Sequence, residues 1–141
     1  MRRFKFNYTE ARGFTFPLIP IILKNKVNKK QSGYIALVDS GAVFCVFHID
    51  VAKALEINLS KIVDKVYFRG VGKTGKDFKG KLYILDLMVA QKGSSHEFEC
   101  PVVFSNDISK DGHPLLGMGG FFSNFSKITF DSQSKKVILE D

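Results

Sequence analysis

The sequence has no tryptophan, only two cysteines and no long hydrophobic run. Two cysteines in 141 residues exclude the disulfide-rich scaffold that small secreted domains often use. The longest apolar window, from Phe16 to Leu23, contains two prolines and is far too short to cross a bilayer. The N-terminal residues alternate polar and apolar side chains and lack the unbroken apolar core of a signal peptide. We therefore expect a soluble, cytoplasmic protein with no membrane partner.

The chain does contain enough apolar side chains for one folded core. Hydrophobic residues make up 45% of the sequence, and fourteen phenylalanines supply most of the aromatic groups. The charged fraction of 25% does not suggest disorder. We expect a single domain over residues 1–141, with residues 1–30 supplying N-terminal strands.

Positive charge exceeds negative charge by seven, and the excess gathers in two apparent loops. A nucleic-acid site also needs aromatic side chains between the basic ones for stacking, and only Phe68, Phe78 and Tyr83 qualify here. We interpret the lysines as solvated loop residues and do not expect nucleic acid as a partner. The two groups are Lys24, Lys26, Lys29 and Lys30, and Arg69, Lys73, Lys76, Lys79 and Lys81.

Most segments have the pattern of β-strands. Phe4, Phe6 and Tyr8 alternate with polar residues, which is typical of a half-buried strand. Many short strands with little helix predict an all-β fold, either a small closed barrel or a sandwich. The other predicted strands cover residues 14–23, 34–38, 66–68, 82–90, 98–104, 127–131 and 137–139.

One or two short helices are expected beside these strands. Val51 and Leu55 lie one helical turn apart, so we expect a helix over residues 51–57. Asp50 is its predicted N-cap and Asn58 a suitable residue to end it. Residues 121–125 are expected to form another turn or two.

The chemistry is concentrated in Asp39-Ser40-Gly41-Ala42, which follows the apolar run Tyr34–Val38. A carboxylate delivered by a buried strand onto a glycine turn costs free energy unless hydrogen bonds or a proton compensate. Asp39 is therefore a candidate for acid–base chemistry. The plainer interpretation is an Asx-type turn at the end of a strand. A second apolar run that ends in glycine, Leu115-Leu116-Gly117, follows later in the chain.

Together these motifs resemble the retropepsin-like aspartic proteases. In that family a hydrophobic strand ends in Asp-Thr/Ser-Gly-Ala, and a later apolar-apolar-Gly passes beneath the catalytic loop. The resemblance implies a small closed barrel of the retropepsin type and an aspartic endopeptidase that hydrolyses extended polypeptides, with no cofactor and no metal. Viral members often carry Arg and then Asp or Asn after the second glycine, where this chain has Met118-Gly119-Gly120. The resemblance assigns Asp39 as the catalytic residue, Ser40, Gly41 and Ala42 as loop support, and Leu115, Leu116 and Gly117 as packing beneath the loop.

Hydrolysing a peptide with carboxylates alone needs two of them facing one water, one ionised and one protonated. The chain offers one suitable copy, because no aspartate other than Asp39 is followed by Ser-Gly or Thr-Gly. The second carboxylate must then come from Asp39 of another subunit. We therefore expect a two-fold symmetric homodimer.

Residues 68–80, between the two motifs, include four glycines. This content predicts a mobile hairpin tip. The resemblance implies that the hairpin is a flap that closes over the peptide, which would bind as an added strand. Val71 and Ile84 would then contribute apolar subsites. The predicted flap residues are Gly70, Val71, Gly72, Lys73, Thr74 and Gly75.

Other interpretations remain open. Cys45, His48, His96 and Cys100 could form a tetrahedral zinc site, although a buried cysteine with surface histidines is the plainer interpretation. A Cys45 nucleophile has no support from its apolar neighbours. The main alternative function is a non-catalytic peptide-binding module on the same barrel. A basic barrel that binds nucleic acid through its lysine loops is a third hypothesis.

Overall fold

The computed structural model describes residues 1–61, 64–68 and 78–141. Among these residues no helix is both long and apolar enough to cross a membrane. The described chain forms strands β1 Arg3–Asn7, β2 Thr9–Ala11, β3 Phe14–Phe16, β4 Leu18–Lys24, β5 Gln31–Val38, β6 Cys45–His48, β7 Asp64–Phe68, β8 Phe78–Gln91, β9 Ser94–Ser105, β10 Leu115–Leu116, β11 Lys127–Asp131 and β12 Lys136–Glu140, with the helix α1 Ile49–Ala54 and the 3-10 helix η1 Phe122–Asn124.

Six strands close into a barrel. Their order is β4-β5-β10-β6-β9-β8, and β8 pairs back onto β4 to complete the ring. Most neighbours are antiparallel, but β10 runs parallel to β5 and β6 runs parallel to β9. Strand β7 adds to the free edge of β8. The predicted all-β fold is confirmed as a small closed barrel with one short α-helix and one 3-10 turn.

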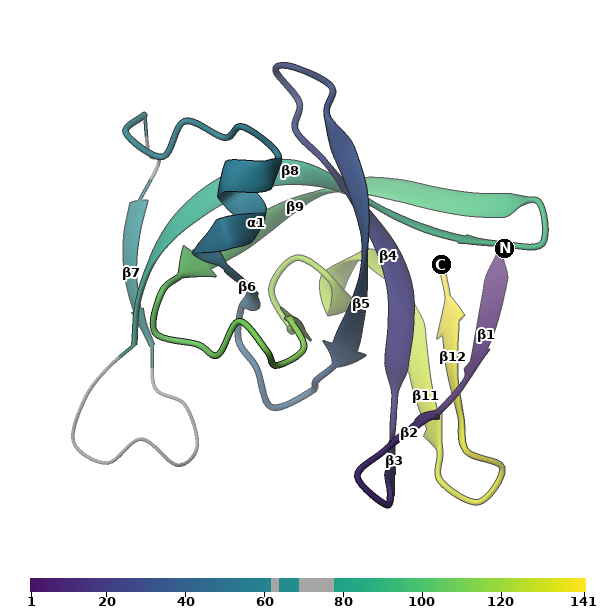
Figure 1. The fold of residues 1–141 in the computed structure, drawn as a ribbon. Coiled ribbons are helices and arrows are strands. Elements are labelled where there is room, and N and C mark those ends of the chain that lie inside the picture. The colour runs from purple at the N-terminus through teal and green to yellow at the C-terminus, as the bar shows by residue number, and fades with distance from the viewer. Residues whose placement is uncertain (62–63, 69–77) are drawn as a thin grey trace.

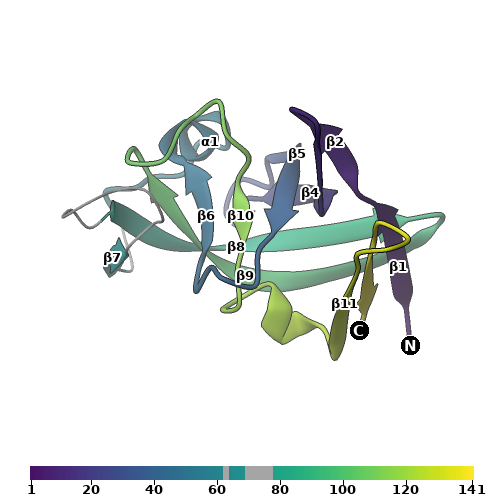
Figure 2. The same cartoon turned by 90° about the horizontal axis from the view of Figure 1, so that it is seen from below.

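A separate sheet joins the two ends of the chain. Its order is β1-β12-β11, so β12 lies between two partners. Figures 1 and 2 show β8 and β9 extending from the barrel to this sheet, where the two termini lie close together. Gln91, at the end of β8, exchanges hydrogen bonds with the backbone of Lys5 in β1 and so ties the long hairpin to the sheet.

The core follows from the period-two pattern of the strands. Leu85, Leu87 and Val89 on β8 are fully buried, whereas Ile84 on the opposite face is 40% exposed. Strand periodicity of this kind sends alternate side chains to opposite faces. Each large apolar side chain that is buried contributes about 1.5–3 kcal/mol. The largest fully buried aromatic side chains are Phe4, Phe47, Phe104 and Phe121.

The helix prediction is correct in place but wrong in its ends. Helix α1 covers Ile49–Ala54, and its N-cap is His48, whose Nδ1 accepts a hydrogen bond from the backbone N–H of Asp50 at 3.1 Å. Asp50 instead lies in the first turn, where a negative charge stabilises the helix N-terminus. The helix ends before Glu56, which has a φ of 52°, because Leu55 and Ile57 both turn into the core.

Three lysines of the first group form ion pairs on the barrel wall. Lys24 lies 3.0 Å from Glu97, and Lys30 lies 3.1 Å from Glu56. Lys26 reaches Asp86 and Glu99 at 2.9 and 2.8 Å. Hydrogen bonds to these two carboxylates, Asp86 first, raise the pKa of Lys26 to about 12. These lysines anchor the turn between β4 and β5 to the neighbouring strands.

Candidate active site

Asp39 is placed by a strand that is fixed on both sides. Strand β5 lies between β4 and β10, and its residues Ala36 and Val38 are buried. The backbone N–H of Asp39 donates to the carbonyl oxygen of Leu116 at 3.0 Å. Asp39 itself is half-buried. The sequence therefore delivers a carboxylate from the barrel wall to a partly open position.

The turn after Asp39 uses one of its two carboxylate oxygens. The N–H of Gly41 donates to Asp39 Oδ1 at 2.8 Å, and the N–H of Ala42 donates to the Asp39 carbonyl oxygen at 3.2 Å. The hydrogen bond from Gly41 to the side-chain oxygen of Asp39 makes this an Asx-type turn. No described residue donates a hydrogen bond to Asp39 Oδ2. Ser40 and Gly41 are exposed, and Ala42 is half-buried.

The Leu115-Leu116-Gly117 segment runs directly beneath this turn. As β10, it places Leu115 beside Leu37 and Leu116 beside Val38. Leu116 is fully buried. A Cβ on Gly117 would come within 2.8 Å of the carbonyl oxygen of Ala42 and would collide with that of Phe44. Glycine is therefore required where the two chain segments cross.

Two further hydrogen bonds join the crossing segments. The N–H of Met118 donates to the carbonyl oxygen of Ala42 at 2.8 Å, and the N–H of Gly119 donates to that of Val43 at 2.7 Å. Phe44 and Gly119 also form a parallel β-bridge. The structure thus brings the two predicted motifs, which are far apart in sequence, into one rigid unit.

A cleft of about 710 Å³ opens above this unit. Most of its walls are apolar, and Asp39 and Asp107 are the acidic side chains among the described residues that line it. A pocket with largely apolar walls and few polar groups is typical of a ligand site. The lining residues are Asp39, Gly41, Ala42, Val43, Phe44, Val46, Tyr67, Phe68, Phe78, Asp107, Ile108, Ser109 and Leu115.

The predicted flap lies outside the described residues, since Gly70, Val71, Gly72, Lys73, Thr74 and Gly75 all fall within 69–77. The strands on either side are described. Phe68 at the end of β7 pairs with Phe78 at the start of β8, and their rings stack with centroids 5.2 Å apart. Both residues line the cleft.

Several cleft residues were missed by the sequence analysis. Tyr67, Asp107 and Ile108 line the cleft because β7 and the loop after β9 come together there, and no sequence motif predicts their position.

Ile84 was expected to form an apolar subsite, and that expectation is wrong. Its strand position points it to the outer face of β8, whereas its neighbour Leu85 enters the core.

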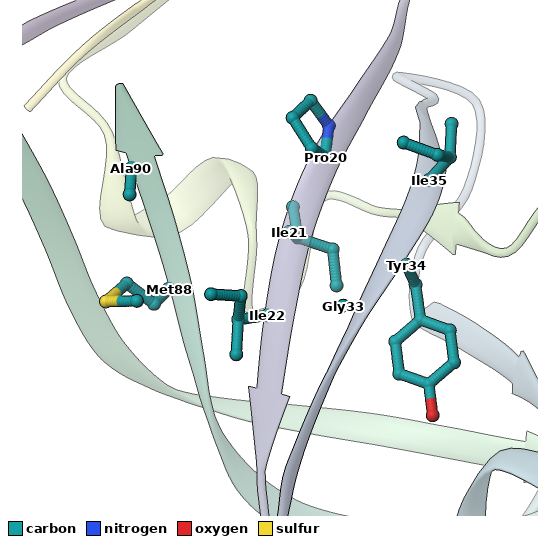
Figure 3. Close-up of a pocket in the computed structure, with 8 residues that line it drawn as sticks. All are labelled: Pro20, Ile21, Ile22, Gly33, Tyr34, Ile35, Met88 and Ala90. Carbon is teal, nitrogen blue, oxygen red and sulfur yellow. The ribbon is translucent and has the colours of Figure 1, made fainter. Parts of the chain in front are cut away.

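A second hollow lies on the outside of the barrel, between β4, β5 and β8 (Figure 3). Its volume is about 310 Å³. Of the described side chains that line it, none is a carboxylate, imidazole, thiol or amine. This outer hollow therefore offers no acid–base pair, whereas the cleft contains Asp39 in its wall and is the candidate active site.

The two cysteines meet inside the barrel. Cys45 and Cys100 are fully buried free thiols with their sulfur atoms 3.7 Å apart. The hydrogen bond from Cys100, together with one from the N–H of Gly117 at 3.4 Å, lowers the pKa of Cys45 despite burial. The same hydrogen bond to Cys45, and burial, raise the pKa of Cys100 far above its ordinary value.

The histidines of the zinc interpretation do not join this pair. His48 caps α1, while His96 lies between the Arg2 guanidinium and the carbonyl oxygen of Asn124. Within residues 1–61, 64–68 and 78–141, no three or more His, Cys, Asp or Glu side chains are grouped so that they could hold a metal ion.

No protein-family model matches this sequence, and no curated protein matches it. The fold is similar to the crystal structure of a retropepsin-like aspartic protease from Rickettsia conorii, with a TM-score of 0.60 over 98% of this chain and 91% of that chain, at 18% identity. A second similar structure is EIAV protease complexed with the inhibitor HBY-793, covering 77% of this chain and 88% of that one at 16% identity, but its TM-score of 0.38 is too low to support an argument. The chain therefore has a retropepsin-like fold, as the motifs predicted.

Proposed function

We propose that this protein is an aspartic endopeptidase that hydrolyses peptide bonds in extended polypeptides as a homodimer, with one Asp39 from each subunit. The position of Asp39 carries this proposal. It stands at the end of a fixed strand, over the Leu-Leu-Gly crossing and in the wall of the 710 Å³ cleft. The retropepsin-like fold supports the same conclusion.

The chemistry follows from two carboxyl groups that share one proton. The ionised Asp39 takes a proton from water, and the water oxygen attacks the peptide carbonyl carbon. The protonated Asp39 of the other subunit gives its proton to the carbonyl oxygen, which yields a tetrahedral diol. Collapse of this diol breaks the C–N bond, and a proton passes to the leaving nitrogen. Two close carboxyls reach this half-protonated state because they cannot both ionise easily.

The cleft favours an extended substrate with apolar side chains. Tyr67, Phe68 and Phe78 form one apolar wall, and Val43 and Leu115 belong to the wall near Asp39. A peptide that lies along strand edges can add backbone hydrogen bonds to these side-chain contacts. Closure of the flap predicted at Gly70–Gly75 over the bound peptide stays a prediction.

Replacing Asp39 with Asn tests the proposal. Asn keeps the size and can accept the Gly41 hydrogen bond, but it cannot exchange a proton, so kcat/KM should fall by about 10²- to 10⁴-fold. Cleavage of denatured casein and of a quenched fluorescent peptide library would measure the loss. Asp131→Asn, at the end of β11 and away from the cleft, is the matched control and should keep its activity. If Asp39→Asn cleaves at the rate of the control, Asp39 is not the catalytic residue.

A non-catalytic peptide-binding module is the second candidate. The Asx turn favours it, because an aspartate with a purely structural role would make the same Gly41 hydrogen bond. Under this alternative, wild-type protein binds the library peptides without cleaving them at any protein concentration. Asp39→Asn then leaves peptide affinity unchanged.

A further inference from the structure

A third hollow, of about 420 Å³, lies between β7, the start of β8 and the end of β9. Three lysines line it, Lys65, Lys79 and Lys81, together with one carboxylate, that of Asp107. We call it the basic hollow, because the charged residues among its described lining carry a formal excess of two positive charges. A cavity with this charge attracts anions.

The register of the strands places the three lysines on one face. Lys65 of β7 lies directly opposite Lys81 of β8, and Tyr67 lies opposite Lys79. Residues that are directly opposite share a face, and so do residues two apart along one strand. Like charges in opposite positions destabilise a strand pair, so the arrangement of Lys65 and Lys81 costs free energy.

The charge of these lysines is not balanced within the described part of the chain. The carboxylates that the structure describes form ion pairs with Lys24, Lys26 and Lys30, but none of them pairs with a lysine of the basic hollow. Asp107 instead accepts the backbone N–H of Lys79 at 2.7 Å. An anion bound here would supply the missing negative charge and offset the repulsion between the opposed lysines.

The basic hollow adjoins the candidate active-site cleft. Tyr67 and Asp107 line both of them. On the cleft side of this boundary the lining includes the apolar Phe68 and Phe78, and on the other side it includes the lysines. An extended peptide advances about 3.3 Å per residue, so a chain that leaves the cleft past Tyr67 reaches the basic hollow with its next side chains.

We propose that the basic hollow binds an acidic side chain of the polypeptide substrate, so that Lys65, Lys79 and Lys81 select peptides with Glu or Asp beside the apolar segment in the cleft. This inference rests on the proposed function, because it assigns a preference to the same substrate. A peptide is favoured over a nucleic acid because the hollow continues the cleft and its 420 Å³ holds a few side chains, not a run of nucleotides.

Pairs of peptides that differ only in one Glu or Gln test this preference. All pairs share one apolar segment, and the varied position moves one residue at a time along either flank. At the best position, wild-type protein should cleave the Glu peptide with a kcat/KM about five- to tenfold higher than its Gln partner, because each ammonium group adds a modest attraction. The ratio should shrink as the ionic strength rises.

Lys65→Glu is the decisive variant. It brings the formal charge of the hollow to zero, so the Glu/Gln ratio should fall to about one. The fold should not weaken, because a carboxylate at this position lies opposite Lys81. Lys92→Glu is the matched control, since it changes the total charge equally and Lys92 is exposed just after the far end of β8. It should keep the wild-type ratio.

Binding of the same peptides to Asp39→Asn protein, followed by fluorescence anisotropy, separates this inference from the proposed function. If Lys65→Glu removes a Glu preference in binding while wild-type protein never cleaves, the inference about the hollow stands and the protease function fails. Cleavage with the same Glu/Gln ratio in Lys65→Glu and Lys92→Glu, or with no Glu preference at any position, contradicts the inference and leaves the function standing.

Two further measurements complete the test. If Lys65→Glu weakens the binding of single-stranded DNA while Glu and Gln peptides behave alike, the hollow serves nucleic acid and the inference fails. Should Lys65→Glu unfold at a lower urea concentration than Lys92→Glu, Lys65→Gln removes the same positive charge without adding a negative one. It should then reduce the Glu/Gln ratio by a smaller factor, and an unchanged ratio contradicts the inference.

Discussion

Individual backbone atoms determine whether the Asp39 loop can form. Gly117 lies so close to the carbonyl oxygens of Ala42 and Phe44 that no side chain fits between them. A Cβ on Gly33, in the strand β5 that ends just before Asp39, would meet only the carbonyl oxygen of Ile21 at 3.7 Å, which is an ordinary contact. Two glycines near one strand therefore have different tolerances for a methyl group.

Gly117→Ala should destabilise the protein by about 1–3 kcal/mol, because the crossing segments must separate to admit the methyl group. Peptide cleavage should fall with it, since the same crossing holds the Asp39 turn. Urea unfolding and casein cleavage measure the two effects.

Gly33→Ala is the control and should change stability by less than about 1 kcal/mol. Equal destabilisation by both substitutions would show that the Gly117 crossing is not tight.

At the scale of elements, Arg2, just before β1, binds the carboxylate of Asp141, just after β12, through its backbone N–H and its guanidinium. We call this contact the terminal clamp, and it depends on an ionised Asp141. The backbone hydrogen bond from Arg2, followed by its guanidinium, lowers the pKa of Asp141 below 3.8. A carboxyl whose pKa is lower in the folded state stabilises the fold above its unfolded pKa. That contribution is lost as the pH falls through the folded pKa.

Asp141→Asn should therefore reduce the free energy of unfolding at about pH 5, and the difference from wild type should shrink as the pH approaches about 2. Urea unfolding at a series of pH values provides the measurement. Asp131→Asn alone does not serve as a control here, because a hydrogen bond from Ser134 lowers the pKa of Asp131 as well. Glu10→Gln, in β2, is the better comparison. If the free energy of unfolding of Asp141→Asn differed from that of wild type by the same amount at every pH, the terminal clamp would be contradicted.

At the scale of the whole molecule, one chain carries half of the proposed site. The remaining described acidic residue in the cleft, Asp107, accepts a hydrogen bond from the Lys79 N–H at 2.7 Å and lies in the loop after β9. Activity should therefore depend on the encounter of two chains.

Specific activity should fall on dilution and approach zero below the dimer dissociation constant. Its pH profile should be bell-shaped and decline at high pH, once both carboxyls are ionised. Progress curves over a range of protein concentrations, run beside sedimentation velocity, provide the measurement. Constant specific activity in a purely monomeric solution would rule out the shared pair.

Much of this architecture could be predicted from local sequence patterns. The strand over residues 127–131 matches β11, and the alternation around Phe4 matches β1. The helix ends were not predictable in this way, because His48 takes the capping role through its ring nitrogen. The cleft wall at Tyr67 and Ile108 was missed because β7 and the end of β9 meet only in the folded chain.

By itself, the sequence determined the motifs: the aspartate on a glycine turn, the Leu-Leu-Gly run and the alternation of each strand. These are local properties of side-chain size, polarity and backbone freedom. Only the tertiary structure decided that β8 closes the ring on β4, that Gly117 crosses under Ala42 and that β12 is filled on both edges. Such pairings join residues far apart in the chain, and their free energy comes from packing and hydrogen bonds that exist only once the segments meet.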